Sequence, residues 1–330
     1  MKPFDYYKVA SVAQAFSLLS RHQQKAAILA GGSDLLGMMK DRLEGPKFKM
    51  PYFLIDIKGI QELNYIREQK TGLRIGAGTP LSEMVSSDLI AKKYPLLHQA
   101  ASQVGVPQIR NVGTLGGNLC QKPRCWYFRG KLFPDCFRKG GNNCYASSGE
   151  NRYHAVIGGA NCYKIHPSDL APALLTLNAR VEIGSSKGNR MVPLEKFYVG
   201  PEINILGETI LSPQELVLAV EIPNPVATSK GVYLKLKERQ AFDFAVVSVA
   251  VNLSFKNSVI DQARIAFGGL APYPVRAVKA EAALKGKGLK DAISTACKEA
   301  TDGAQPLSDN GYKVDAAKGI LEEALVHLAG

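Results

Sequence analysis

The chain has 330 residues, enough for two or three domains, and its hydrophobic fraction of 46% is typical of a globular protein. No apolar run approaches the ~20 residues that span a bilayer, and residues 1–19 lack the apolar core of a signal peptide. We therefore expect a cytoplasmic protein without a membrane span, which would be exported only if a partner carried it. The net charge of +12 could suit a nucleic-acid partner. Half of this excess positive charge, however, lies in residues 121–166, which contain eight cations and two anions. We therefore expect no nucleic-acid partner.

Residues 1–57 are predicted to form a small α/β unit. Ser11 can cap a helix that runs to Leu19, and short buried strands are expected at 26–30 and 52–57. Between the strands, Ala30-Gly31-Gly32-Ser33-Asp34-Leu35 combines a tight turn with a helix start that Ser33 or Asp34 can cap. A strand, a turn and a helix N-terminus expose free backbone N–H groups, which suit a phosphate. The alternative is that the two glycines only allow the chain to turn between the strand and the helix, without binding a ligand.

Residues 58–224 show a different pattern. We expect strands at 64–66 and 73–75 and amphipathic helices at 81–90 and 95–104. The sequence Gly76-Ala77-Gly78-Thr79 lacks the third glycine and the later acidic residue of a Rossmann loop, so we reject that fold. A second glycine-rich loop, Thr114-Leu115-Gly116-Gly117-Asn118, favours a dinucleotide, because a pyrophosphate needs many hydrogen-bond donors.

The remaining predicted elements divide at Pro223-Asn224-Pro225, the best linker candidate. Before this linker we expect a helix at 170–177 capped by Ser168, a hairpin of 179–183 and 190–192, and a strand at 216–222. After it we expect strands at 232–236, 244–255 and 264–267, followed by helices at 275–284, 289–301 and 314–328. Strands followed by helices indicate a separate α+β domain.

Five of the six cysteines lie in one stretch: Cys120, Cys125, Cys136, Cys144 and Cys162. Clustered thiols usually bind a metal or form disulfides, and nothing extracellular in the chain favours disulfides. The stretch has neither the close C-x2-C pairs of structural zinc sites nor the spacing of bacterial ferredoxins. Four thiolates that converge in space could still hold an iron–sulfur cluster, so the spacing predicts a metal or a cluster without naming which. The neighbouring cations would stabilise thiolates, and the alternative is a solvated basic loop.

Other candidate residues have simpler interpretations. Trp126-Tyr127-Phe128 could stack on single-stranded nucleic acid, but we consider this by far the weaker interpretation. His154 and His166 are expected to be hydrogen-bonded histidines rather than metal ligands. Cys297 is expected to pack within a helix, and Asp243 to act as a cap or to lie near a cofactor. The sequence shows no Ser-His-Asp or paired-carboxylate arrangement.

Together the two glycine loops resemble the FAD loops in the flavoprotein subunits of molybdenum hydroxylases, the family of xanthine dehydrogenase, aldehyde oxidoreductase and carbon monoxide dehydrogenase. The resemblance covers nearly the whole chain, and its further motifs are Phe4-Asp5-Tyr6, Pro167-Ser168-Asp169-Leu170-Ala171-Pro172, Ile222-Pro223, Asp243-Phe244-Ala245 and Gly268-Gly269-Leu270-Ala271-Pro272. It implies an α+β chain: a two-subdomain FAD-binding fold of the vanillyl-alcohol-oxidase type, then a C-terminal antiparallel-sheet-and-helix domain of the carbon monoxide dehydrogenase flavoprotein type. The implied boundaries are 1–57, 58–224 and 225–330.

Residues 119–166, called the cysteine-rich segment below, are similar to an insert in the 4-hydroxybenzoyl-CoA reductase β subunit and in some periplasmic aldehyde oxidoreductase subunits. The matching pieces are Arg124-Cys125-Trp126-Tyr127-Phe128-Arg129, Arg138-Lys139-Gly140-Gly141, Cys144-Tyr145-Ala146 and Gly149-Glu150-Asn151. The resemblance implies a [4Fe-4S] cluster bound by Cys125, Cys136, Cys144 and Cys162, with Cys120 as the spare thiol.

The resemblance also implies residues that bind the cofactor. Backbone amides of the two loops would hold the FAD pyrophosphate, and the loop residues are Ile28, Leu29, Ala30, Gly31, Gly32, Ser33, Asp34, Leu35, Thr114, Leu115, Gly116, Gly117 and Asn118. Asp169 would hydrogen-bond the cofactor, with Val104, Val217 and Lys235 nearby. Asp34 would turn away from the diphosphate as a helix cap.

The activity implied by the resemblance is that of an oxidoreductase subunit. It would pass electrons through FAD between a small [2Fe-2S] subunit and an external electron acceptor, while a large molybdopterin-binding subunit carries out the substrate chemistry. The alternatives are a free-standing flavin oxidase and a zinc-stabilised binding module.

Overall fold

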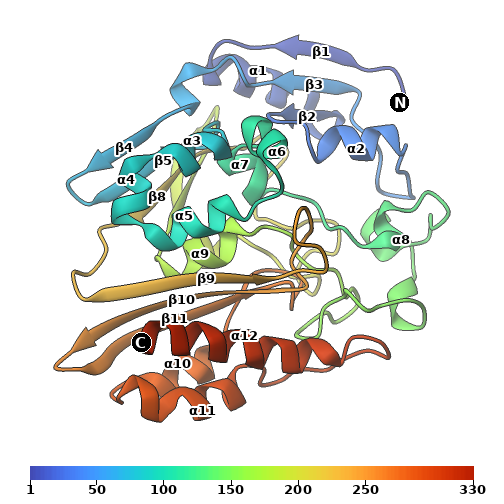
Figure 1. Cartoon of the computed structure of the whole chain (residues 1–330). Coiled ribbons are helices and arrows are strands. Elements are labelled where there is room, and N and C mark those ends of the chain that lie inside the picture. The colour runs from blue at the N-terminus through green and yellow to red at the C-terminus, as the bar shows by residue number, and fades with distance from the viewer.

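The computed structural model describes residues 1–330, and its N-terminal part is a three-stranded parallel sheet of order β1-β3-β2. The elements of this unit are β1 (Asp5–Lys8), α1 (Val12–His22), β2 (Ala26–Leu29), α2 (Leu35–Lys40) and β3 (Phe53–Asp56). As predicted, Ser11 caps α1 by accepting a hydrogen bond from the N–H of Gln14. Ala15 and Leu19 of α1 share a small apolar core with Ile55 of β3. The unit forms one end of the molecule, blue in Figure 1.

A five-stranded antiparallel sheet of order β4-β5-β8-β6-β7 follows. Its strands are β4 (Ile66–Gln69), β5 (Gly72–Gly76), β6 (Arg180–Ser185), β7 (Gly188–Pro193) and β8 (Leu216–Pro223). The helices of this part are α3 (Leu81–Ser86), α4 (Asp88–Lys93), α5 (Pro95–Ser102), α6 (Pro107–Val112), α7 (Leu115–Leu119) and α9 (Leu170–Thr176).

Two of the predicted elements in this part differ from the structure. The helix predicted over 81–90 is two helices, because Ser87 has an extended backbone after α3 and then caps α4 through the N–H of Ile90. The strand predicted at 64–66 starts only at Ile66, because a tight turn at Gln61–Leu63 precedes it. The hairpin is present as predicted, and the helix predicted at 170–177 is α9, which ends at Thr176. Its N-cap residue is Asp169, whose side chain makes no capping bond, whereas the Ser168 hydroxyl accepts from the N–H of Ala171 at 3.1 Å.

The C-terminal part is a four-stranded antiparallel sheet of order β12-β11-β10-β9, covered on both faces. Its elements are β9 (Ser229–Leu236), β10 (Val247–Lys256), β11 (Val259–Gly268), β12 (Val275–Arg276), α10 (Val278–Leu284), α11 (Leu289–Glu299) and α12 (Tyr312–Ala329). Because successive side chains of a strand point to opposite faces, Ala250 joins the core that contains α5 and α9, whereas Val249 and Val251 join the core under α10, α11 and α12.

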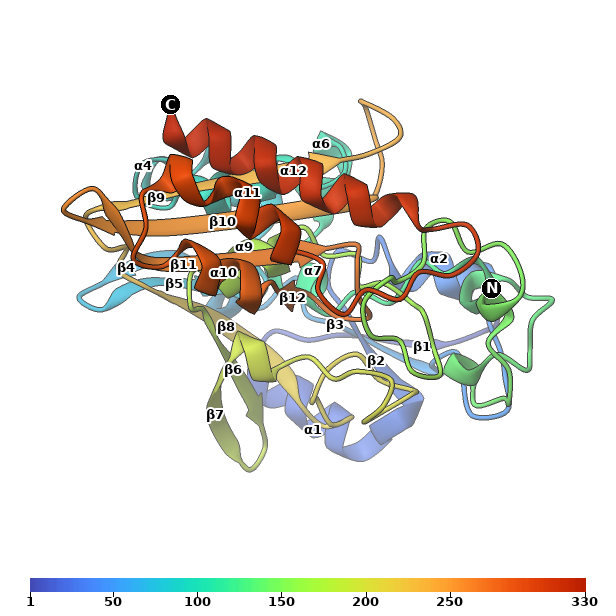
Figure 2. The same cartoon turned by 90° about the horizontal axis from the view of Figure 1, so that it is seen from below.

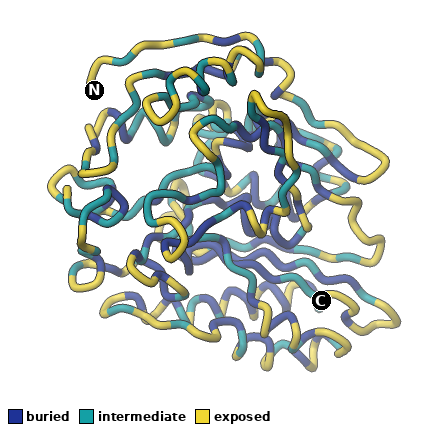
Figure 3. The backbone as a smooth tube through the Cα atoms, turned by 180° about the vertical axis from the view of Figure 1, so that it is seen from behind, coloured by how far each residue is buried: buried dark blue, intermediate teal, exposed yellow.

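Figures 1 and 2 show the three helices α10, α11 and α12 on the outer face of this sheet, and Figure 3 shows its central strands as the most continuously buried part of the chain. The helix predicted to start at Val275 starts at Val278 instead, because Val275 and Arg276 pair with β11 as an edge strand. Cys297 packs in this core, as predicted.

The cysteine-rich segment has little regular structure of its own. It contains one short helix, α8 (Trp126–Arg129), and isolated 3-10 turns, and it lies beside α2 and the start of α12. On one side, Phe128 and Cys136 share a small core with Met38 of α2. On the other side, Lys313 of α12 donates to the carbonyl oxygen of His154 at 3.0 Å. The segment therefore takes its packing from both the N-terminal unit and the C-terminal domain.

Candidate functional site

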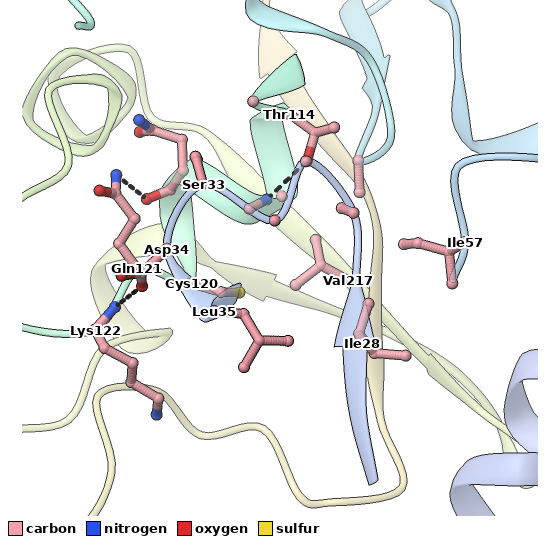
Figure 4. Close-up of a pocket in the computed structure, with 18 of the residues that line it drawn as sticks. Ile28, Ser33, Asp34, Leu35, Ile57, Thr114, Cys120, Gln121, Lys122 and Val217 are labelled. Atoms are coloured by element: carbon pink, nitrogen blue, oxygen red, sulfur yellow. Dashed lines mark hydrogen bonds between the residues drawn. The ribbon is translucent and has the colours of Figure 1, made fainter. Parts of the chain in front are cut away.

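A cavity lies between the N-terminal unit and the five-stranded sheet, where the two glycine loops meet. Figure 4 shows Asp34, Gln121 and Lys122 at one end of it and the apolar Ile28 and Val217 at the other. Thirteen of the residues predicted from the sequence line this cavity: Ile28, Ala30, Gly31, Gly32, Ser33, Asp34, Leu35, Val104, Thr114, Gly116, Gly117, Asn118 and Val217. Leu29 and Leu115 do not line it and are buried in the adjoining cores.

The first loop presents unpaired backbone donors. The N–H groups of Gly31, Gly32, Ser33 and Asp34 have no backbone acceptor within the chain. A Cβ atom at Gly31 would lie 2.1 Å from the carbonyl oxygen of Val112, so the two loops can approach each other only with glycine there. Gly32 has a φ of 73°, in the left-handed region that favours glycine. The result is a row of free N–H groups, which suits an anion.

The second loop is held rigidly and leaves space at one position. Thr114 accepts a hydrogen bond from the N–H of Gly117 at 3.1 Å, and the N–H of Gly116 donates to the carbonyl oxygen of Ala77 at 2.8 Å. Gly117 lines the cavity, and a Cβ atom there would meet only the Thr114 hydroxyl, at 3.0 Å. A side chain at Gly117 would thus occupy space that a ligand could use, without displacing the protein backbone.

Asp34 does not cap α2, so this part of the sequence prediction was wrong. No side chain caps that helix. The Asp34 carboxylate instead accepts hydrogen bonds from the N–H of Lys122 at 2.8 Å and from the guanidinium of Arg129 at 2.6 Å, and it pairs with Arg124 at 3.1 Å. The two arginines outcompete a helix N–H for this carboxylate, since hydrogen bonds between ionised groups are stronger than those from a neutral donor.

Asp169 and Lys235 lie outside the cavity lining and bind each other. The Lys235 ammonium donates to the Asp169 carboxylate at 2.8 Å, and the Tyr233 hydroxyl donates to its other oxygen at 2.8 Å. Burial raises the pKa of Asp169, and Lys235 opposes that shift. Lys235 also donates to the carbonyl oxygen of Gln103 at 3.0 Å, next to Val104 of the cavity wall. The pair therefore supports the cavity wall from behind.

The structure separates the five clustered cysteines into two groups. Cys125, Cys136, Cys144 and Cys162 converge on a second, small and mostly apolar cavity, whereas Cys120 lines the first cavity. All six cysteines are free thiols. No three His, Cys, Asp or Glu side chains are grouped tightly enough to hold a single metal ion. What brings the four thiols together is their position in the lining of this one cavity.

The histidines are hydrogen-bonded, as the sequence predicted. The Nε2 atom of His154 lies 3.2 Å from the Cys125 sulfur. The Nδ1 atom of His166 accepts from the N–H of Ser168 at 3.4 Å. Burial lowers the pKa of His154 to about 4, so its ring is neutral near pH 7.

Three of the cations around the thiols are buried, which excludes a fully solvated basic loop. The exposed fractions of Arg138, Lys139 and Lys164 are 1%, 0% and 1%. The Lys139 ammonium donates only to carbonyl oxygens, those of Gly130 at 2.6 Å and Phe133 at 3.1 Å. Burial raises the pKa of the neighbouring Cys125 thiol to about 12. Buried positive charge and a buried thiol with a raised pKa, that of Cys125, therefore lie close together in this part of the chain.

Glu208 connects the two cavities, and sequence reasoning missed it because it lies in an irregular loop without a motif. Its buried carboxylate pairs with Arg138 and Lys164 of the thiol cavity and with Lys122 of the first cavity, at 3.1 Å for Lys164 and 2.6 Å for Lys122. Burial alone would raise the pKa of Glu208, but the three cations hold it well below its ordinary value.

Comparison with known proteins identifies relatives along the whole chain. Residues 2–225 match the family described as the FAD binding domain in molybdopterin dehydrogenase, and residues 232–328 match the carbon monoxide dehydrogenase flavoprotein C-terminal domain. The chain is 34% identical to the aldehyde oxidoreductase FAD-binding subunit PaoB of Escherichia coli K12, covering 98% of each chain. It is 30% identical to the carbon monoxide dehydrogenase medium chain of Afipia carboxidovorans, covering 93% of this chain and 88% of that one.

A solved structure with the same fold is that of carbon monoxide dehydrogenase from Hydrogenophaga pseudoflava, in a form that lacks the Mo-pyranopterin moiety of the molybdenum cofactor. It superposes with a TM-score of 0.78 at 29% identity, over 98% of this chain and 96% of that chain. The mixed helix-and-sheet architecture predicted from the sequence is confirmed by this likeness.

The Glu208 ion pairs generate a stability prediction. Glu208→Gln should lower the free energy of unfolding by about 3–5 kcal/mol at pH 7, because it leaves buried cations without their carboxylate. A carboxyl whose pKa is depressed on folding contributes stability above its ordinary pKa, here 4.5, and loses it as the pH falls. The difference in melting temperature between wild type and variant should therefore be largest near neutral pH and narrow below pH 4.5.

The control for this prediction is Glu44→Gln, which removes an ion pair with Lys2 on the exposed surface. Exposed pairs contribute little, so this variant should melt like the wild type at every pH. Equal melting temperatures for Glu208→Gln and wild type at pH 7 would contradict the structural role assigned to Glu208.

Proposed function

Because this chain belongs to the family of FAD-binding subunits of molybdopterin dehydrogenases, we propose that it passes electrons through FAD between an iron–sulfur subunit and an external acceptor. The observation that carries this proposal is the cavity between the two glycine loops, with its row of free N–H groups. Substrate chemistry would take place on a separate molybdopterin-binding subunit.

The residues of the first cavity fit FAD. The N–H groups of Gly31 to Asp34 would hydrogen-bond the diphosphate, and the open space at Gly117 would admit it. The apolar residues Ile28, Val104 and Val217 would pack against the ring systems. When bound, FAD supplies the ability to accept and release electrons. We place Asp169 and Lys235 behind the wall, where they hold Val104 in position rather than contacting the ring directly.

The second cavity fits a [4Fe-4S] cluster, with Cys125, Cys136, Cys144 and Cys162 as its ligands. Four thiolates are the ligand set of such a cluster, and all four of these cysteines line this one cavity. The cluster would supply an additional site for one electron. Arg138, Lys139 and Lys164 would offset the negative charge of its thiolates. Cys120 would not be a ligand, because it lines the other cavity.

We further propose that the chain works in a heteromeric complex, with a large molybdopterin-binding subunit and a small [2Fe-2S] subunit. Relatives described as a medium chain support the heteromeric part of this proposal. We place the domain boundaries at 1–57, 58–224 and 225–330, since each range contains one complete sheet. No helix of the chain is both long and apolar enough to cross a membrane. We propose a cytoplasmic location, which would change only if a partner subunit carried the complex out of the cytoplasm.

The absorption spectrum of the purified protein tests the cofactor content. We expect flavin bands together with the broad iron–sulfur absorption that underlies and extends beyond them. Extraction should yield one FAD and about four irons per chain. A colourless protein that contains zinc would contradict both cofactor assignments, and flavin without iron would contradict only the second.

A side chain at Gly117 should exclude FAD. Gly117→Val places two methyl groups in the space assigned to the diphosphate, and we expect it to lose FAD while keeping its fold. The matched control is Gly37→Val in α2, where a Cβ atom has no neighbour within 4 Å and which does not line the cavity. It should retain FAD. Flavin-to-protein ratio and circular dichroism are the measurements, and stoichiometric FAD in Gly117→Val would show that the diphosphate lies elsewhere.

Single cysteine substitutions should separate the ligands from the spare thiol. Cys→Ser at each of the four ligand positions should reduce the iron content, since serine is a poor replacement for a thiolate in a cluster. Cys120→Ser should keep about four irons and its FAD. Iron is counted by chemical analysis and the cluster by electron paramagnetic resonance. Loss of iron in Cys120→Ser, together with retention in Cys125→Ser, would reverse the assignment.

A further inference from the structure

Asp34 joins the first glycine loop to the cysteine-rich segment. It lines the FAD cavity, yet every hydrogen bond its carboxylate makes comes from that segment. One oxygen accepts from the N–H of Lys122 at 2.8 Å, and the other from the Arg129 guanidinium at 2.6 Å, with Arg124 at 3.1 Å. The two arginines lie on either side of Cys125 in the sequence.

The position of Arg129 depends on the local fold of the segment. Arg129 is the last residue of α8, and its guanidinium also donates to the carbonyl oxygens of Pro123 at 2.8 Å and Lys122 at 3.2 Å. Those carbonyls belong to the chain immediately before Cys125. If the chain around Cys125 loses its conformation, both arginines move away from Asp34 together.

A carboxylate in the wall of a cavity for a diphosphate is unfavourable unless a cation neutralises it. Two negative charges a few ångströms apart repel each other, and the repulsion is stronger where the protein excludes water. Arg124 and Arg129 remove this repulsion and leave an excess of positive charge beside the cavity. Packing of the cysteine-rich segment against the first loop therefore makes that loop more favourable for a diphosphate.

We propose that Asp34 makes FAD binding depend on the folded cluster segment. With the segment in place, Arg124 and Arg129 neutralise Asp34 and the cavity accepts the diphosphate. With the segment disordered, Asp34 is an unpaired anion in the cavity wall and repels it. Asp34 is thus a positioning residue that makes the FAD site complete only after the thiol cavity has formed. This inference rests on the proposed FAD and cluster sites.

The test measures the FAD dissociation constant after reversible removal of flavin, in the full-length chain. Cys125→Ser should weaken FAD binding at least about tenfold, and adding Asp34→Asn should restore most of that loss, because the repelling charge is gone. Asp34→Asn alone is measured as the reference for the double variant, so that any effect of the asparagine itself is subtracted. Recovery of FAD binding when the negative charge of Asp34 is removed supports this mechanism. If Cys125→Ser had instead damaged the fold of the FAD site, a second substitution would not restore binding.

A second arm leaves every cysteine in place. Arg124→Gln with Arg129→Gln should weaken FAD binding by a similar factor while the iron content stays at the wild-type value, and Asp34→Asn should again restore it. The matched control is Glu215→Gln, which removes another carboxylate of the same cavity, one that pairs with Arg190 of β7. Glu215→Gln should not restore FAD binding in either background.

The outcomes separate the three proposals. If wild-type protein does not bind FAD, the proposed function fails. If Cys125→Ser keeps its iron, the cluster assignment fails, and the arginine arm decides on Asp34 alone. Unchanged FAD affinity in the arginine variant, or no recovery on adding Asp34→Asn, overturns the proposed role of Asp34.

Discussion

The geometry of both cavities depends on the buried carboxylate of Glu208. Removing a guanidinium or an ammonium from water costs several kcal/mol unless an anion and further hydrogen bonds offset it. Glu208 supplies that anion for Arg138 and Lys164, which follow Cys136 and Cys162 by two residues each. Through Lys122 the same carboxylate also holds one end of the FAD cavity. The Glu208 side chain therefore links the chain next to Cys136 and Cys162 to the end of the FAD cavity at Lys122.

Glu208 does not offset every buried cation in and around the cysteine-rich segment. Lys139 contacts only carbonyl oxygens, and so does Lys313, which α12 inserts beneath the segment. Burial lowers the pKa of Lys313 to about 7, which shows how unfavourable its environment is for a cation. The four thiolates of the proposed cluster would place negative charge among these groups. Binding of the cluster and folding of the segment would then be one linked process.

The sequence predicted those features that depend on local chemistry, and it failed where partners came from distant parts of the chain. Glycine loops, the Ser11 cap and the α12 helix follow from neighbouring residues, and the structure contains them. The Asp34 prediction was wrong because Arg129, 95 residues away, is a stronger partner than a helix N–H. Glu208 has no motif, and only the folded chain brings it to Arg138, 70 residues away. Spacing alone could not separate Cys120 from the other thiols, since that depends on which cavity each one faces.

The two cavities use different kinds of positive charge, and this difference bears on how firmly each would hold its cofactor. The FAD cavity presents neutral N–H dipoles at Gly31 to Asp34, which water can satisfy when no ligand is bound. The thiol cavity is bordered by buried full charges, and although Glu208 pairs with Arg138 and Lys164, Lys139 has only carbonyl oxygens as partners, so the thiolates of the proposed cluster would add the anion that it lacks. For the cofactors proposed above, this difference would favour a flavin that exchanges with solution and a cluster that binds as the segment folds. Asp34 lies between the two cavities. In our proposal, folding of the segment around the thiol cavity brings Arg124 and Arg129 to Asp34 and so neutralises a negative charge in the wall of the FAD cavity.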